Sequence, residues 1–225
     1  MGMLSPARKL LKFFHPESIP WPGTVFYNMV SKTRIFQRHY DLIAEDITGY
    51  RSEGSILDIG TGPGWLLIKL HQISSRLQVT GLDVSPSMVT KARNNLAKAG
   101  LSHVIEVKEG NASSLPFGDC SFDVVVSTGS IHHWKYPSTA LDEIHRVLKN
   151  GGYGLIYDLV SDTPASVLRE TAREFGKLHM VSLWLHAFEE PFYSHKDFHL
   201  LADPTQFKEG QSRFVGAMCC LVLRK

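Results

Sequence analysis

Three glycines at alternate positions, Gly60, Gly62 and Gly64, follow directly on the apolar run Ser55–Ile59. Because glycine has no Cβ, a loop with this spacing can turn tightly and let a ligand come close to its backbone. Asp83 ends the next apolar run, 83 − 60 = 23 residues beyond the first glycine. A carboxylate there can accept hydrogen bonds from both hydroxyls of a ribose. These residues predict a site for a ribose-containing cofactor.

His132 and His133 could carry a second kind of chemistry. They lie in the segment Ser130–Trp134, just after the fourth apolar run of the chain. Histidine titrates near neutral pH, so either ring could be the base that removes a proton from an acceptor. The alternative is that one ring shapes the pocket and the other is half-exposed on a loop.

Histidine and cysteine spacing gives no metal site. His195 and His199 are four residues apart, as zinc ligands on a helix are, but no glutamate follows His195 in the metalloprotease arrangement and no third ligand is obvious. Of the three cysteines, Cys120 stands alone and Cys219 and Cys220 are adjacent. That set fits neither a zinc site nor a disulfide framework, which favours the reducing cytoplasm as the compartment.

Alternating strands and helices must position these residues. Parallel strands are expected at Ser55–Ile59, Leu77–Val84, His103–Lys108, Phe122–Thr128 and Tyr153–Val160. The helices between them are crossover connections, which return the chain to the same edge of one sheet. A further helix is expected over about Thr24–Thr48, and the helix after the fourth strand should end at Asn150–Gly152. Two late strands, near Gln206–Phe214 and Ala217–Leu223, would add an antiparallel hairpin.

The pattern predicts an α/β fold, a three-layer, Rossmann-like, doubly wound sheet with a C-terminal hairpin. We expect an N-terminal helical segment over 1–54, a cofactor-binding core over 55–160, a variable helical substrate cap over 161–205, and strands that complete the core sheet over 206–225. A chain of 225 residues suits one such domain with a modest cap.

Charge and hydropathy limit the partners. The formal net charge is only +2 and the basic residues are scattered, so we expect no nucleic-acid partner. No apolar run approaches the roughly 18 residues of a membrane span. The basic, partly apolar segment Met1–Phe14 could pack on its own domain, and weak membrane contact is the alternative.

Five segments in order resemble the class I S-adenosylmethionine-dependent methyltransferases. The glycine loop resembles their motif I, which is G-x-G-x-G rather than the dinucleotide G-x-G-x-x-G. The matching segments are Asp58–Gly64, Gly81–Met88, Gly110–Phe117, Phe122–Ser127 and Ile144–Gly152. They extend over about Ser55 to Asp158, and they most resemble the branch that includes the ubiquinone and menaquinone methyltransferases.

The resemblance implies S-adenosylmethionine as cofactor, S-adenosylhomocysteine as product, and a set of binding residues. The glycines would line the methionine and ribose portion, with Asp58 near the amino group and Asp83 on the ribose hydroxyls. The adenine would lie beside Val84 and Met88. The full set implied is Asp58, Gly60, Thr61, Gly62, Gly64, Asp83, Val84, Met88, Asn111, Ala112 and Ser127.

Asn111 departs from the family pattern, which usually has aspartate at this position beside the adenine edge. An amide oxygen can accept a hydrogen bond from the adenine amino group but lacks the charge that strengthens it. We therefore expect somewhat weaker cofactor binding.

The resemblance implies direct in-line methyl transfer to an acceptor. The Asn/Asp-Pro-Pro-Tyr signature of amino and base methylation is absent after the fourth strand, where Ser127–Ser130 stands instead, so we expect a small-molecule acceptor. The sequence specifies neither the atom that is methylated nor the oligomeric state. A protein that binds the cofactor without catalysis remains an alternative. An NAD-dependent oxidoreductase is a second alternative, which the glycine spacing disfavours.

Overall fold

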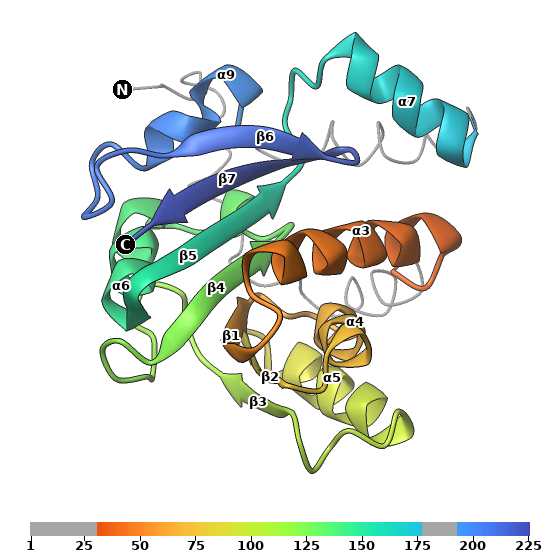
Figure 1. The fold of residues 1–225 in the computed structure, drawn as a ribbon, viewed down its shortest axis with the longest axis vertical. Helices are drawn as coiled ribbons and strands as arrows, with labels where there is room; N and C mark the ends of the chain where they lie inside the picture. Colours follow the sequence, from red (N-terminus) through yellow and green to blue (C-terminus); the bar gives the residue numbers. More distant parts are fainter. Residues whose placement is uncertain (1–30, 177–192) are drawn as a thin grey trace.

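The computed structural model describes residues 31–176 and 193–225, which form a seven-stranded sheet with helices on both faces (Figure 1). The strand order is β3-β2-β1-β4-β5-β7-β6. The bounds are β1 Gly54–Ile59, β2 Leu77–Asp83, β3 Glu106–Glu109, β4 Phe122–Thr128, β5 Leu148–Asp158, β6 Gln211–Val215 and β7 Met218–Arg224. Strands β1 to β5 pair in parallel, and β7 pairs antiparallel with both β5 and β6. The predicted doubly wound sheet with a C-terminal hairpin is confirmed.

Two hydrophobic clusters lie on opposite faces of this sheet. One cluster lies between the sheet and helices α3, α4 and α5, and includes Ile43, Leu67 and Leu96 of these helices. The other lies between the opposite face and helices α6 and α9, and includes Ile144 and Phe198. The helices are α3 Arg34–Tyr50, α4 Trp65–Ile73, α5 Pro86–Lys98, α6 Pro137–Val147, α7 Ala165–Phe175 and α9 His195–Phe198, with short 3₁₀ turns η1 Ile131–His133 and η2 His199–Leu201. Burial on both faces explains why β4 is a nearly unbroken apolar run.

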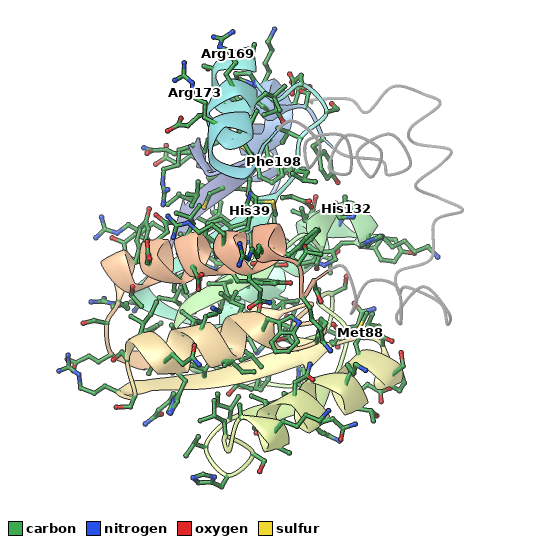
Figure 2. The ribbon with its side chains drawn as sticks, turned by 90° about the vertical axis from the view of Figure 1, so that its right-hand side faces the viewer. His39, Met88, His132, Arg169, Arg173 and Phe198 are labelled. Carbon is green, nitrogen blue, oxygen red and sulfur yellow. The ribbon has the colours of Figure 1, made fainter. Side chains whose placement is uncertain are left out.

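The order in which strands are added to the sheet reverses between β1 and β4. From β1 the chain winds outward through β2 to β3, and then returns to the other side of β1 as β4 and β5. In open sheets of this kind, ligands bind at the carboxyl ends of the strands where such a reversal occurs. Figure 2 views the molecule from the right-hand side of Figure 1.

Several predicted boundaries are wrong. Helix α3 begins at Arg34 rather than Thr24, with residues 31–33 in a turn and the earlier ones outside the described ranges, and it continues past Gly49 to Tyr50. Strand β3 begins at Glu106 rather than His103, because the N–H groups of Val104 and Ile105 both donate to the carbonyl of Leu101 and close a turn.

The helix and strand at the far side of the sheet also differ from the prediction. Helix α6 ends at Val147 and β5 begins at once, with the glycines that were expected to end the helix inside the strand. Gly151 there has φ 74° and donates its N–H to the carbonyl of Lys225, so a contact with the C-terminus extends the strand. Strand β6 begins at Gln211 rather than near Gln206, since residues 199–207 form a 3₁₀ helix followed by turns and bends.

Among the described residues, no helix is both long enough and apolar enough to cross a membrane. The domain division predicted from the sequence stays a prediction, because residues 1–30 and 177–192 lie outside the described ranges.

Candidate functional site

Four strand ends meet at one level of the sheet edge. In the β1 ladders, Ile59 is paired with Leu82 of β2 and with Ser127 of β4, and Asp83 at the end of β2 is paired with Glu109 of β3. The segments that follow β1, β2, β3 and β4 therefore start side by side. The sheet brings together the cofactor-binding residues that the sequence predicted.

The glycine loop is a continuation of β1 that folds back over β2. The N–H groups of Gly60 and Thr61 both donate to the carbonyl of Leu82, at 2.8 and 3.0 Å. All three glycines of the loop have positive φ, with 74° at Gly60, 51° at Gly62 and 78° at Gly64. An L-residue rarely adopts this conformation, so the loop requires glycine for its backbone shape alone.

Asp83 holds this loop through its carboxylate. Its Oδ2 accepts the N–H of Gly62 at 2.8 Å, and its Oδ1 accepts the N–H of Ser85 at 2.9 Å. Burial raises the pKa of Asp83, and the two backbone donors oppose that shift. Each carboxylate oxygen can still accept a second hydrogen bond.

Asp58 lies beneath the loop and is almost completely buried. The hydroxyl of Thr61 donates to its Oδ2 at 2.7 Å, whereas its Oδ1 has no hydrogen-bond partner among the described residues. Burial raises the pKa of Asp58 to about 7; the Thr61 hydrogen bond opposes the rise and the charge of Asp83 adds to it. Two buried carboxyl groups with unused acceptor capacity favour a cationic ligand.

The residues predicted beside an adenine lie along the ends of β2 and β3. Met88, in the first turn of α5, is buried (labelled in Figure 2), whereas Val84 is half-buried. Asn111 follows β3, and its Oδ1 accepts the N–H of Ser113 at 2.8 Å. Ala112 is buried.

Serine hydroxyls join the ends of β1 and β4. The Oγ of Ser127 lies 2.8 Å from the carbonyl of Ile59 and 3.2 Å from the Oγ of Ser130. The indole N–H of Trp134 donates to the same Ser130 oxygen at 2.9 Å. Ser127 thus presents its side chain to the protein's own network, and Ser130 is a site residue that the sequence analysis missed.

The two candidate histidines are placed differently. His132 is buried and its Nδ1 lies 2.8 Å from Oδ2 of Asp158, the last residue of β5. His133 is half-buried, and its ring contacts that of His132 in a tilted arrangement with centroids 4.0 Å apart. Asp158 was missed. A carboxylate inside an apolar predicted strand was the signal that could have found it. Among the described residues, no group of three histidine, cysteine or acidic side chains is arranged to hold a metal ion.

Comparison with known proteins agrees with this geometry. Residues 57–156 match the family model described as a methyltransferase domain. The chain is 32% identical over 154 residues to a phosphatidylethanolamine N-methyltransferase of Cereibacter sphaeroides, covering 67% of this chain and 69% of that protein. It is 32% identical over 126 residues to a ubiquinone/menaquinone biosynthesis C-methyltransferase of Marinomonas, covering 56% of this chain and about half of the relative, 49%.

A solved structure from Methanococcus maripaludis, assigned to the S-adenosyl-L-methionine-dependent methyltransferases, superposes with a TM-score of 0.69 at 27% identity. The match covers 90% of this chain and 92% of that one. Sequence family, relatives and fold therefore agree along most of the described residues. The chain belongs to the class I S-adenosylmethionine-dependent methyltransferases, in the branch that includes the ubiquinone and menaquinone methyltransferases.

Proposed function

We propose that this protein transfers a methyl group from S-adenosylmethionine to a small-molecule acceptor by direct displacement. The observation that carries the proposal is the pair of buried carboxyl groups around the glycine loop. Asp83 bonds the loop at Gly62, and Asp58 lies beneath it with one oxygen unpartnered among the described residues. The cofactor has a ribose, an ammonium group and a sulfonium, and these are the groups that two such carboxylates can bind.

The residues fit the cofactor part by part. The second acceptor positions of the Asp83 oxygens suit the two ribose hydroxyls, and the unpartnered Oδ1 of Asp58 suits the methionine ammonium group. Met88 and Ala112 offer apolar contact to an adenine, and Asn111 offers a polar edge. A pyrophosphate on the same loop would instead meet buried carboxyl groups of its own charge, which disfavours a dinucleotide.

The methyl group of the bound cofactor is already electrophilic, so the chain mainly has to orient the two reactants. Holding reactants in line is worth roughly 7–11 kcal/mol of barrier. The serine network that joins Ile59, Ser127 and Ser130 fixes the ends of β1 and β4 relative to one another. Strand ends that are fixed in this way can hold the methyl donor and the acceptor in line.

The acceptor is proposed to be a small molecule. After β4 the chain carries Ser127-Thr-Gly-Ser130 in place of the signature for methylation of amino groups and bases. Of the two relatives above, one is named for N-methylation of phosphatidylethanolamine and the other for C-methylation in ubiquinone and menaquinone biosynthesis. Both relatives act on small molecules, but the methylated atom differs between them. The family therefore supports a small acceptor and does not indicate which of its atoms is methylated.

Cofactor affinity is expected to rise by about tenfold between pH 6 and pH 8. The ammonium group favours ionised Asp58, whose pKa in the cofactor-free protein is about 7, so binding at lower pH must release a proton. Calorimetric titration with S-adenosylhomocysteine across this range measures the slope, and buffers of different ionisation enthalpy count the released proton.

Asp58→Asn is the matched variant for this prediction. It can retain the hydrogen bond from Thr61, and it should bind S-adenosylhomocysteine with little pH dependence. The raised pKa of Asp58 also means that ionisation destabilises the cofactor-free fold as pH rises from about 4 to about 7, so the variant should be the more stable protein at pH 8. An unchanged pH slope in the variant would rule out Asp58 as its source.

Asn111→Asp is expected to bind S-adenosylhomocysteine about fivefold more tightly than the native chain. A carboxylate strengthens a hydrogen bond from the adenine amino group by roughly 1 kcal/mol relative to an amide. The turn should survive, because an aspartate can accept the Ser113 N–H as the asparagine does. Calorimetry compares the two proteins, and equal or tighter binding by the native chain would contradict the role given to Asn111.

The proposed function is tested by binding and by transfer. S-adenosylhomocysteine should raise the unfolding temperature of the full chain and NAD should not, because a ligand of the folded state stabilises it. A tritium-labelled methyl group should then pass from S-adenosylmethionine to a metabolite in a cell extract. Stabilisation by NAD alone would refute the cofactor assignment, and binding without transfer to any metabolite would indicate a non-catalytic sensor or assembly protein.

A further inference from the structure

Asp158 and His132 form a hydrogen-bonded pair beside the cofactor-binding residues. The Nδ1 of His132 lies 2.8 Å from Oδ2 and 3.0 Å from Oδ1 of Asp158. The same carboxylate accepts the backbone N–H of His132 at 3.1 Å and that of Leu159 at 2.8 Å. Two backbone donors therefore fix the carboxylate, and the carboxylate in turn fixes the orientation of the imidazole.

The pair is buried, and two of the groups beside it, Tyr193 and Cys219, stay neutral near pH 7. The side chains of His132 and Asp158 are 3% and 1% exposed. Burial and the charge of Asp158 raise the pKa of Tyr193, and burial together with Asp162 and Asp158 raises the pKa of Cys219 to about 12. His133 also faces the pair, with its ring tilted by 44° against that of His132 at a centroid distance of 4.0 Å.

The contact determines which imidazole nitrogen carries the proton. A carboxylate only accepts hydrogen bonds, so the Nδ1 that faces Asp158 must be the protonated nitrogen. The neutral ring then has its lone pair on Nε2. A carboxylate in this place also stabilises the imidazolium that forms when Nε2 takes up a second proton.

The pair lies at the sheet edge that the cofactor-binding residues share. His132 belongs to η1, directly after β4, and Asp158 ends the neighbouring β5. The N–H of Gly129 donates to the carbonyl of Tyr157 at 2.7 Å, which keeps the two strand ends together. Figure 2 shows His132 on the same side of the molecule as Met88.

We propose that Asp158 positions His132 as the proton acceptor for a hydroxyl group of the methyl acceptor, which makes the protein an O-methyltransferase. The inference rests on the proposed function and names its substrate class. Asp158 is the positioning residue, because it acts through His132 and not on the acceptor.

The step balances in atoms and charge. The hydroxyl oxygen forms a bond to the methyl carbon with its own lone pair, and its proton passes to Nε2 of His132. The bond between sulfur and the methyl carbon breaks, and its electron pair stays on sulfur. The positive charge of the sulfonium thus reappears on an imidazolium that is bonded to Asp158.

A hydroxyl acceptor needs this base, whereas an amine does not. A neutral amine has a reactive lone pair and can lose its proton to water after transfer, but a hydroxyl oxygen is a weak nucleophile until its proton is taken. A base fixed inside the protein therefore favours oxygen over nitrogen as the methylated atom.

Nuclear magnetic resonance of histidine side chains tests the arrangement without cofactor or turnover. In the full chain labelled with ¹⁵N-histidine, His132 should show the Nδ1–H tautomer above neutral pH. Asp158→Asn should shift it toward the Nε2–H tautomer, because an amide N–H can donate to Nδ1. His132→Asn identifies the signals, and His103→Asn, at an exposed position, should leave them unchanged. A native Nε2–H tautomer would overturn the proposal.

Methyl transfer to two probe acceptors tests the substrate class. Catechol offers hydroxyl groups and ethanolamine offers an amine, with tritium-labelled S-adenosylmethionine as donor. We expect transfer to catechol, with kcat about 10²–10⁴-fold lower in His132→Asn and the affinity for S-adenosylhomocysteine unchanged. His103→Asn, the same change at an exposed position, should match the native protein.

The outcomes separate this inference from the proposed function. The inference is overturned if catechol methylation survives in His132→Asn, or if only ethanolamine is methylated. In either case the proposed methyltransferase function still stands. Transfer to neither probe by a protein that binds S-adenosylhomocysteine also overturns the hydroxyl class. A well-folded native protein that does not bind S-adenosylhomocysteine refutes the proposed function itself.

Discussion

Replacing Gly60 with alanine is expected to lower the free energy of unfolding by about 2–5 kcal/mol. Alanine at φ 74° costs about 1–2 kcal/mol. Its Cβ would lie 2.5 Å from Oγ and 2.7 Å from Cβ of Ser130, and relieving such a clash costs a further 1–3 kcal/mol or so. Chemical denaturation of the cofactor-free chain measures the loss.

The effect should extend to binding because Ser130 is not a free surface residue. Its hydroxyl accepts the indole N–H of Trp134 and contacts Ser127, so moving it disturbs the segment that carries His132. S-adenosylhomocysteine affinity should therefore fall together with stability. A loss of binding with unchanged stability would show that Gly60 is needed for the ligand and not for the contact with Ser130.

Two variants isolate the cause of the Gly60 effect. Gly49→Ala makes the same change in α3, at an exposed position with nothing within 4 Å of the new Cβ, and should stabilise the fold by about 0.5–1 kcal/mol. Ser130→Gly removes both clashing atoms. The double variant Gly60→Ala with Ser130→Gly should therefore lose less stability than the two single losses added together. Strictly additive losses would mean that the clash has no part in the effect.

The sheet and the place of the candidate cofactor-binding residues in it could be predicted because their signals are local. A buried parallel strand is an unbroken apolar run, and the loop that follows β1 needs positive φ at alternate positions, which only glycine adopts readily. Crossover connections make the strands parallel, so their carboxyl ends meet at one edge, which brings Asp58, Asp83 and Ser127 together there without knowledge of any contact.

The rest of the site depends on contacts between distant residues, which no local pattern encodes. Ser130 lies against Gly60, 70 positions earlier in the chain, and Asp158 meets His132 only because β5 is the neighbour of β4. The wrong boundary at Gly151 has the same origin, since its N–H bonds the carbonyl of the C-terminal Lys225 and extends a strand where glycines suggested a stop. Sequence reasoning brought the candidate cofactor residues to one edge of the sheet, and the fold was needed to find the partner of the histidine.

Replacing Asp83 with alanine is expected to weaken S-adenosylhomocysteine binding by at least about 100-fold. Hydrogen bonds to a charged group are worth roughly 1.5–3 kcal/mol each, so two ribose hydroxyls account for about 3 kcal/mol at the lower end. The variant also leaves the N–H of Gly62 without its acceptor, which loosens the loop around the ligand. Calorimetry measures the affinity, and thermal unfolding of the cofactor-free variant shows whether it is folded.

Glu109→Ala is the matched control, because this exposed carboxylate is paired with Asp83 in the sheet and ends the adjacent strand. Its loss should change the affinity by no more than about twofold. A 3′-deoxy analogue of S-adenosylhomocysteine separates the ribose contact from the loop contact: Asp83→Ala should weaken binding of the analogue less than binding of the full ligand. If both ligands lose affinity equally, Asp83 acts only by holding Gly62, and the ribose hydroxyls must be bound by another group. The proposed cofactor site would then keep its position at the sheet edge but lose its best-defined contact.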